Sequence, residues 1–334
     1  MENIMWKNKK WMEWDFYLLN LIMIMVLTSV PVRLKASFEN IDIAAEAMKS
    51  AEAYTARKEG IVSLYYNAAG LTDLDRKEIN VQYSRMMLLL DNDNLNYFNA
   101  MIGFPVKHVS WAVSFSQFSS ELYSEQVMGL GSAFSLFDLF RKRLSLGLRV
   151  KLLRIRYGEN DYTRLDRLFV NSGYERTGLG LDAGLLLHSL EGFSYGVCFM
   201  NINTPDLTLE ETGADQALVM RAGVSYSLIL SGVLDKILLD LDMEYKKKDI
   251  GFYFGIEPYF QNGVFVPGLG LAIGNKKLAY LTAGMSYQLR IEGVSFKLKL
   301  IDYLLQFNYS FRFALNGMQA GTYGDHFISI SFKF

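Results

Sequence analysis

The sequence predicts an all-β protein, a transmembrane antiparallel β-barrel of about 14 strands with a short N-terminal helical hatch in its lumen. The final stretch, residues 326–334, alternates apolar and polar side chains, so that one face of an extended strand suits lipid and the other suits water. The chain has 20 Tyr and 23 Phe but only five Pro, a composition typical of strands bordered by aromatic girdles. After the N-terminus, the apolar runs are too short for helical membrane spans.

The final strand also predicts how the barrel closes. Its pattern continues to the last residue, which implies that its edge is paired with another strand. Phe332 and Phe334 end the apolar face. We expect these two aromatic residues to form the assembly signal read by the barrel assembly machinery.

Residues 1–36 are expected to be an export signal peptide. Lys7, Lys9 and Lys10 precede a mostly apolar stretch at 16–30, which is shorter than a membrane-spanning helix. Cleavage is expected after Ala36, and an uncleaved membrane anchor is the alternative. The net charge of −1 is not basic enough for a nucleic-acid partner, and the single cysteine excludes an intrachain disulfide.

Residues 37–75 are expected to form the hatch. A barrel of about 14 strands is wider than side chains alone can fill, so an unplugged lumen would leak. Small and apolar residues at helical spacing occupy 41–51, and a further run of small and apolar residues follows at 60–71. The alternative is a disordered periplasmic leader.

Residues 76–334 are expected to form the barrel, with polar stretches at 158–176, 204–215 and 314–324 as extracellular loops and short turns on the periplasmic side. The expected strands are 76–90, 95–104, 108–118, 126–137, 143–157, 177–189, 193–203, 216–229, 235–246, 250–260, 264–274, 278–289, 294–313 and 325–334.

Charged residues predict the register of two strands, because a charge at the bilayer midplane costs about 2–4 kcal/mol for Lys or Arg. On strand 235–246, apolar residues alternate with charged ones that are mostly acids. On strand 143–157, apolar residues alternate with bases and small residues until the pattern slips at Leu152–Leu153, which suggests a bulge. The charges expected to face the lumen are Arg143, Arg149, Lys151, Asp240, Asp242 and Glu244. They could form a selectivity surface, but we favour pairing with one another and with the hatch.

An enzyme is not expected. The only histidines, at positions 108, 188 and 326, lie far apart, and no hydrolase or metal-binding motif is present. We expect no metal and no cofactor. Two glycine trios, at 178, 180 and 184 and at 268, 270 and 274, lack the spacing of a dinucleotide fingerprint. As lumen-facing residues, they would leave room for hatch or ligand, or relieve crowding in a curved sheet.

The hatch carries a family resemblance. The run Tyr65, Tyr66, Asn67, Ala68, Ala69, Gly70, between Leu64 and Leu71, is similar to the aromatic-Asn-Pro-Ala-Gly-Leu signature of FadL-like outer-membrane barrels. Together with Gly324-Asp325-His326 before the last strand, it resembles most closely the PorV-type branch. Ala68 stands where that family usually has proline. The resemblance implies a 14-strand barrel with an N-terminal hatch.

These observations lead to a multi-pass protein in the outer membrane of a Gram-negative-type bacterium, with the surrounding lipid as its first partner. The preferred function is passive uptake of hydrophobic small molecules such as long-chain fatty acids, as the resemblance to FadL implies. The alternative is a PorV-like barrel that binds or shuttles secreted proteins. A purely structural barrel is the third hypothesis.

Overall fold

The computed structural model describes residues 38, 41–57, 59–88, 94–139, 142–161, 163–189, 192–207, 209, 216–246, 248–274, 279–296, 299–316 and 322–334. The expected signal peptide, residues 1–36, lies outside this part of the chain. All statements below refer to the described residues.

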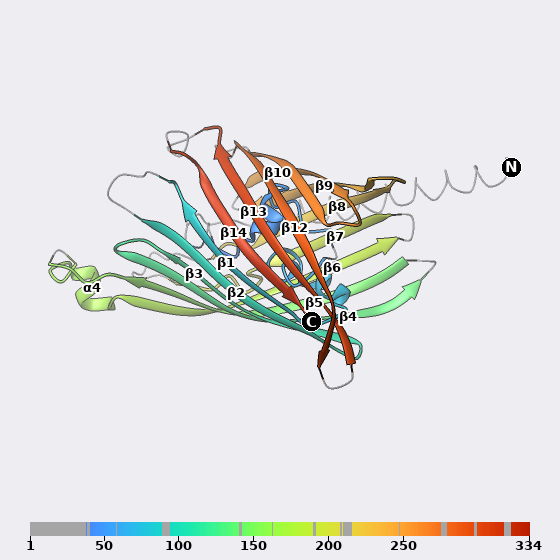
Figure 1. Cartoon of the computed structure of the whole chain (residues 1–334). Coiled ribbons are helices and arrows are strands. Elements are labelled where there is room, and N and C mark those ends of the chain that lie inside the picture. Colours follow the sequence, from blue (N-terminus) through green and yellow to red (C-terminus); the bar gives the residue numbers. More distant parts are fainter. Residues whose placement is uncertain are drawn as a thin grey trace. The chain divides into compact units, whose positions relative to one another are not determined.

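Fourteen antiparallel strands form a closed barrel, as the sequence predicted, and each strand is hydrogen-bonded to its neighbours in chain order (Figure 1). The strands are β1 (Glu78–Met86), β2 (Leu95–Val106), β3 (Val109–Ser119), β4 (Tyr123–Leu139), β5 (Lys142–Tyr157), β6 (Glu175–Ser189), β7 (Phe193–Met200), β8 (Val219–Ile229), β9 (Leu234–Lys246), β10 (Asp249–Phe260), β11 (Phe265–Gly274), β12 (Ala279–Phe296), β13 (Lys299–Ala314) and β14 (Asp325–Lys333).

The last strand closes the barrel. β14 pairs with β13 on one side and with β1 on the other, where Ile79 lies opposite Phe332 and Val81 opposite Ile330. The main chains of Lys77 and Phe334 then exchange two hydrogen bonds of 3.1 and 2.9 Å. The paired edge that the terminal alternation implied is therefore present at both sides of β14.

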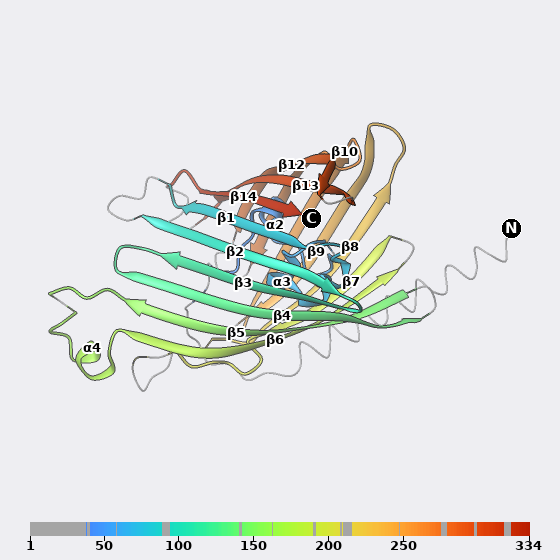
Figure 2. The same cartoon turned by 60° about the horizontal axis from the view of Figure 1, so that its bottom comes forward.

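The two ends of the barrel differ in their connections. The end at which β1 begins and β14 ends carries the short turns, such as Lys107–His108 between β2 and β3. The opposite end carries the long connections, including 158–174, which contains α4 (Arg167–Ser172; Figure 2). Because outer-membrane barrels have short periplasmic turns and long extracellular loops, we call these the periplasmic and extracellular ends.

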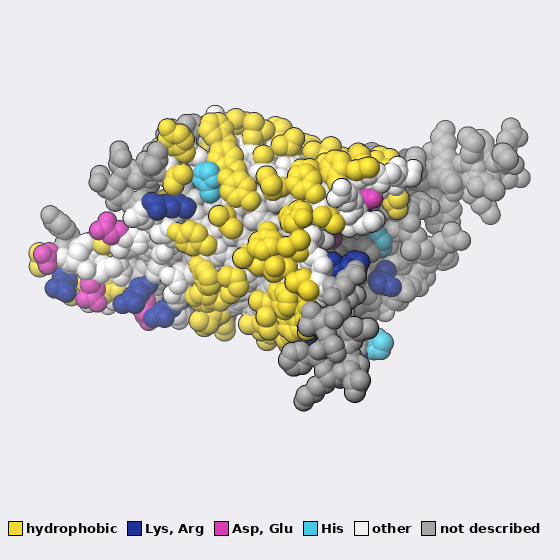
Figure 3. Space-filling model, viewed as in Figure 1, with side chains coloured by type: hydrophobic (Ala, Val, Ile, Leu, Met, Phe, Trp, Pro, Cys, Tyr) yellow, Lys and Arg dark blue, Asp and Glu magenta, His cyan; other side chains and the backbone are white. Residues whose placement is uncertain are grey.

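The outer surface of the barrel is apolar. Leu239 and Leu241 on β9 are 41% and 43% exposed, whereas Asp242, on the inner face of the same strand, is 1% exposed. Figure 3 shows hydrophobic side chains gathered across the wall, with acidic and basic side chains toward the end that carries α4. No described helix has the length and apolar character needed to cross a membrane. The exterior and the closed strand ladder are those of an outer-membrane barrel.

Two predictions about the strands were wrong. No bulge occurs at Leu152–Leu153, because Lys151, Leu152 and Leu153 pair consecutively with both neighbouring strands. Leu153 instead faces inward and is buried, so the change in pattern marks an apolar region of the lumen. A turn was also expected at 290–293, but β12 continues to Phe296 with a register shift between Ile291 and Val294.

The segment before β1 lies inside the ring of strands (Figures 1 and 2). It contains α2 (Ala45–Met48), α3 (Ser63–Tyr66) and the 3₁₀-helix η1 (Ala68–Asp73). We call residues 41–74 the hatch. The helical pattern predicted over 41–51 gives only the single turn α2, because Asp42 and Ala51, which flank it, have positive φ angles of 62° and 53°.

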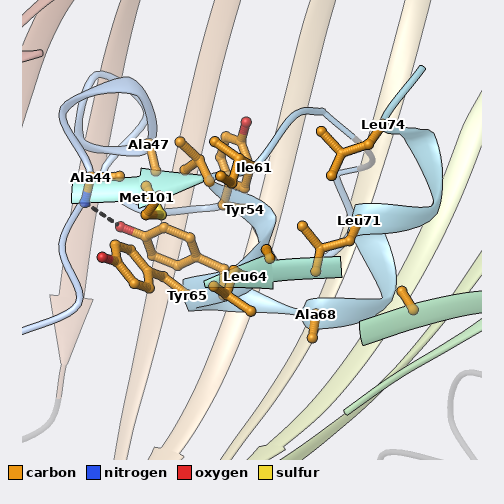
Figure 4. Close-up of a cluster of buried hydrophobic side chains, with 14 residues drawn as sticks. Ala44, Ala47, Tyr54, Ile61, Leu64, Tyr65, Ala68, Leu71, Leu74 and Met101 are labelled. Atoms are coloured by element: carbon orange, nitrogen blue, oxygen red, sulfur yellow. Dashed lines mark hydrogen bonds between the residues drawn. The ribbon is translucent and has the colours of Figure 1, made fainter. Parts of the chain in front are cut away.

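One side of the hatch packs against the wall through apolar contacts. Ile61, Leu64 and Leu71 are at most 2% exposed and belong to a buried cluster that also contains Met101 of β2 and Ala112 of β3 (Figure 4). Burial of such side chains contributes roughly 1.5–3 kcal/mol each. This packing fixes one face of the hatch to β2–β4.

Candidate functional site

Asn67 connects three parts of the molecule. Its side-chain oxygen accepts a hydrogen bond of 3.1 Å from the main-chain nitrogen of Ala69, which caps the start of η1. Its side-chain nitrogen donates to the carbonyl oxygens of Thr55, at 2.8 Å, and Leu185 of β6, at 2.9 Å. Asn67 is 1% exposed, so a single buried amide holds a turn, a second hatch loop and the wall together.

The neighbouring residues of the predicted hatch signature are buried as well. The hydroxyl of Tyr65 lies 2.9 Å from Ser116 of β3, and the hydroxyl of Tyr66 donates to Glu52 at 3.0 Å. Gly70 allows a close contact, because a Cβ there would lie 2.7 Å from the carbonyl oxygen of Arg57. The side chains of the signature thus contact the wall and the rest of the hatch.

Glycines on the inner face of the wall allow the hatch to approach closely. A Cβ added at Gly184 would stand 2.0 Å from Asn67 Oδ1, and one added at Gly270 would stand 2.4 Å from the main-chain nitrogen of Ala51. The same holds at Gly147 and Gly196, where the added atom would lie 2.0 Å from hatch main-chain atoms. Members of both glycine trios therefore leave room for the hatch.

The acids of β9 bind the hatch directly. Asp242 accepts hydrogen bonds from the main-chain nitrogens of Tyr54, at 2.9 Å, and Thr55, at 2.8 Å. Asp240 accepts from Nε of Arg57 at 3.1 Å, and Arg57 also contacts Glu257 of β10 at 2.7 Å. These inward acids therefore pair with hatch donors.

Of the three bases of β5 that were expected to face the lumen, two are buried and one is exposed. Arg149, 2% exposed, contacts Asp42 of the hatch at 2.7 Å, and Lys151 contacts Asp182 of β6 at 2.9 Å. Burial raises the pKa of Asp42, but the Arg149 guanidinium outweighs this and lowers it below the ordinary value. Arg143, also expected in the lumen, is exposed at the periplasmic end of β5.

A cavity of about 480 Å³ lies between the hatch and the wall. Arg149, Lys151, Arg221 and Glu244 provide charged groups, and Arg221 pairs with Glu244 at 2.8 Å. The cavity also borders an apolar cluster, which we call the apolar end. Its buried members are Phe38, Val127, Leu153, Ile155 and Leu207. The cavity therefore offers both apolar contact and charged groups to a ligand.

Beside the cavity, the backbone ladder between β6 and β7 is incomplete. Among the described residues, Ala183–His188 of β6 pair with β7, whereas the pairing of β6 with β5 continues to Glu175. Asn203 covers part of the unpaired edge, because it accepts from the Leu181 nitrogen at 2.9 Å and donates to the Leu179 oxygen at 2.6 Å. One main-chain bond, from the Ile202 nitrogen to the Leu181 oxygen at 2.8 Å, lies beside these two contacts, so the wall is held here by a mixture of main-chain and side-chain bonds.

The segment after β7 completes the wall. Leu207 is 2% exposed and belongs to the apolar end of the cavity. A Cβ at Gly178 would lie 3.0 Å from a terminal carbon of Leu207. Leu207 therefore belongs to the same apolar cluster as Leu153, which lines the cavity, and lies against Gly178 of β6, beyond the part of β6 that pairs with β7.

Sequence reasoning missed several of these residues. Arg57, Lys49 and Glu257 were not singled out, although a buried ion pair requires partners for the acids that were predicted to face inward. Phe38 and Leu207 lie outside the strands and follow no periodic pattern. Among the residues of the apolar end, only Leu153 gave a signal in the sequence. Its apolar side chain interrupts the alternation of β5, and this interruption was interpreted as a bulge.

No known protein family and no curated protein matches this sequence. Similar structures exist, however. The toluene transporter TbuX of Ralstonia pickettii aligns over 87% of this chain and 98% of its own, with 10% identity and a TM-score of 0.55. A FadL homologue of Pseudomonas aeruginosa aligns over 91% and 98%, with 9% identity and a TM-score of 0.54.

A third similar structure is the deltaS2 mutant of the TodX monoaromatic hydrocarbon channel, which aligns over 88% of this chain and 97% of its own, with 10% identity and a TM-score of 0.55. The chain has the fold of these barrels. At this level of identity, the similarity establishes the architecture, which agrees with the FadL-like fold expected from the hatch.

Proposed function

We propose that this protein carries hydrophobic small molecules, such as long-chain fatty acids, passively across an outer membrane. The observation that supports this most is the position of the cavity, whose apolar end lies beside the incomplete ladder between β6 and β7. A hydrophobic molecule in the outer leaflet would reach the cavity there without crossing water. The fold shared with a toluene transporter and a hydrocarbon channel supports the same class of cargo.

The charged part of the cavity favours a cargo with a polar end. Arg149, Lys151 and Arg221 lie on the same cavity as the apolar end. A fatty acid would place its chain against the apolar residues and its carboxylate toward these bases. A pure hydrocarbon has no polar group, so Arg149, Lys151 and Arg221 would gain no partner from it.

Uptake of labelled oleate tests this function. Cells that contain the protein should accumulate the label faster than cells that lack it, and labelled toluene should show a smaller difference. Heat-modifiable gel mobility of the protein in the same cells would establish that the barrel is folded. Equal oleate uptake with and without the folded barrel would contradict the proposal.

A PorV-like role in binding secreted proteins is the second candidate. It is favoured by the extracellular arm 158–174, on which Leu165 and Val170 are 85% and 66% exposed. Exposed apolar side chains on a charged loop suit protein contact. Deletion of residues 159–173 distinguishes the two functions: it should reduce surface attachment of secreted proteins in the PorV-like case and leave oleate uptake intact in the transport case.

A further inference from the structure

The hatch contacts the barrel wall through two chemically different surfaces. Toward β2–β4, its contacts are apolar and include Leu64 and Leu71. Toward β9 and β10, its contacts include buried ion pairs and hydrogen bonds to Asp242, and Ala51 and Ala53 pack in one cluster with Tyr253 of β10. We call the ionic part of this surface the charged seam and define it by Lys49, Arg57 and Glu59 of the hatch and Lys236, Asp240, Asp242 and Glu257 of the wall.

The charged seam runs from the cavity to the periplasmic end of the barrel. Along β9, Glu244 lines the cavity, Asp242 and Asp240 follow on the same face, and Lys236 lies near the periplasmic turn. At that end, the side chains of Lys236 and Glu59 are 29% and 32% exposed. Water therefore reaches one end of the seam, and the cavity lies at the other.

The middle of the charged seam is buried but incompletely paired. The side chains of Arg57 and Glu257 are 1% and 0% exposed, and Lys49 contacts Glu257 at 3.0 Å. Nevertheless, Arg57 Nη1 and one oxygen each of Asp240 and Asp242 have no hydrogen-bond partner among the described residues. Buried polar atoms of this kind are ordinarily satisfied by water.

An ionic contact separates more readily in water than an apolar one. Hydration competes for the charges of an ion pair, whereas it opposes the exposure of Leu64 or Leu71. Removing one partner of a buried pair leaves an uncompensated charge, which draws water into the site. Removal of Arg57 would leave the most charge uncompensated, because Arg57 contacts both Asp240 and Glu257.

From these contacts, we infer that the charged seam is a hydrated passage for small inorganic cations between the cavity and the periplasm, and that Arg57 holds it closed. Four carboxylates face three basic side chains along the seam, which favours cations over anions. The hatch remains attached to β2–β4 when the passage opens. This activity is separate from the carriage of a hydrophobic molecule and does not depend on it.

Conductance of the purified full-length protein in planar bilayers tests the passage, with potassium chloride as the probe. Arg57→Gln should raise the conductance several-fold, because Asp240 and Glu257 then repel each other. In a salt gradient, the reversal potential should move toward that of potassium. Arg57→Lys retains the charge and should stay close to the wild-type conductance.

A second substitution tests the route. Glu59→Gln, at the partly exposed periplasmic end, should move the reversal potential of the Arg57→Gln protein back toward zero. If the current bypassed the charged seam, the same substitution would leave the reversal potential unchanged, and the inferred route would be wrong.

Cysteine labelling separates opening of the seam from loss of the whole hatch. In a Cys198→Ser background, Ser225→Cys lies on β8 opposite Asp240, whereas Ala112→Cys lies in the apolar contact. Both native residues are buried, at 5% and 0% exposure. With Arg57→Gln present, a charged methanethiosulfonate reagent should react faster at position 225 and no faster at position 112.

Two outcomes would overturn the inference. One is an unchanged conductance of the Arg57→Gln protein when heat-modifiable mobility shows that it is folded. The other is an equal gain in labelling at positions 225 and 112, which would show that the hatch leaves the barrel as a whole.

Discussion

The amide of Asn67 fills the space that the missing side chain of Gly184 leaves in the wall. A Cβ at Gly184 would lie 2.0 Å from Asn67 Oδ1, while Asn67 Nδ2 donates to the carbonyl oxygen of the adjacent Leu185. The hydrogen bond from Asn67 Nδ2 requires Asn67 to lie this close to β6, and only a residue without a Cβ leaves the space for it. This pair of residues therefore sets the position of η1 against β6.

Substitution of Asn67 by leucine should loosen the hatch and leave the barrel intact. The change removes three hydrogen bonds and leaves the buried Ala69 nitrogen and the Thr55 and Leu185 oxygens without this partner. Each such loss costs about 1–3 kcal/mol. Limited proteolysis should cleave the hatch faster, whereas heat-modifiable mobility and protein abundance should not change. A protease-resistant hatch in Asn67→Leu would show that these bonds are dispensable.

Substitution of Gly184 by valine should displace the same turn from the other side. The new side chain would overlap Asn67, and overpacking of this kind typically destabilises the folded structure by about 1–3 kcal/mol. A control on the outer face of the same strand is Leu185→Val, because the Leu185 side chain is 42% exposed and points away from the hatch. Bilayer conductance should rise with Gly184→Val and stay unchanged with Leu185→Val.

The fold was predictable where the sequence is periodic. Alternation along β9 and β14 reports which face meets lipid, and the cost of a charge in hydrocarbon leaves one register for Asp240 and Asp242. The site was less predictable, because Arg57, Phe38 and Leu207 belong to irregular segments whose partners lie on distant strands. Leu153 was misinterpreted for a different reason. In a sequence, an inward apolar residue resembles a slipped register unless that part of the lumen is known to be apolar.

Deletion of residues 38–75, with residues 1–36 retained, should give an assembled barrel that conducts ions. The strand ladder closes without the hatch, through the pairing of β1 with β14. Removing the hatch would leave the lumen of a 14-strand barrel open to water. Conductance should exceed that of the Arg57→Gln protein, because the whole lumen opens. A folded deletion protein with wild-type conductance would argue against a plugging role.

A disulfide across the segment that completes the β6–β7 wall should block hydrophobic uptake. A Cβ at Gly178 would lie 3.5 Å from Leu207 Cγ, so cysteines at 178 and 207 lie near the spacing that a disulfide requires. Oxidation should stop oleate uptake, and a reductant should restore it. Cysteines at Thr72 and Ser145, whose hydroxyls lie 3.1 Å apart, provide a control disulfide between hatch and β5. Unimpaired uptake in the oxidised 178–207 protein would exclude this route.

The periplasmic end of the charged seam should respond to acid. Burial raises the pKa of Glu59, but the nearby charges of Lys236 and Arg57 outweigh it and lower the pKa to about 2, from an ordinary value of 4.5. Because the folded pKa is the lower one, the contribution of Glu59 to holding the hatch is complete above about pH 4.5 and is lost as the pH falls toward about 2. The part of any acid-induced rise in conductance that comes from Glu59 should therefore appear only below about pH 5. The glutamine in Glu59→Gln cannot titrate, so this substitution should remove the Glu59 part of the rise in conductance. An identical acid response of the wild-type and Glu59→Gln proteins would assign the whole response to other carboxylates.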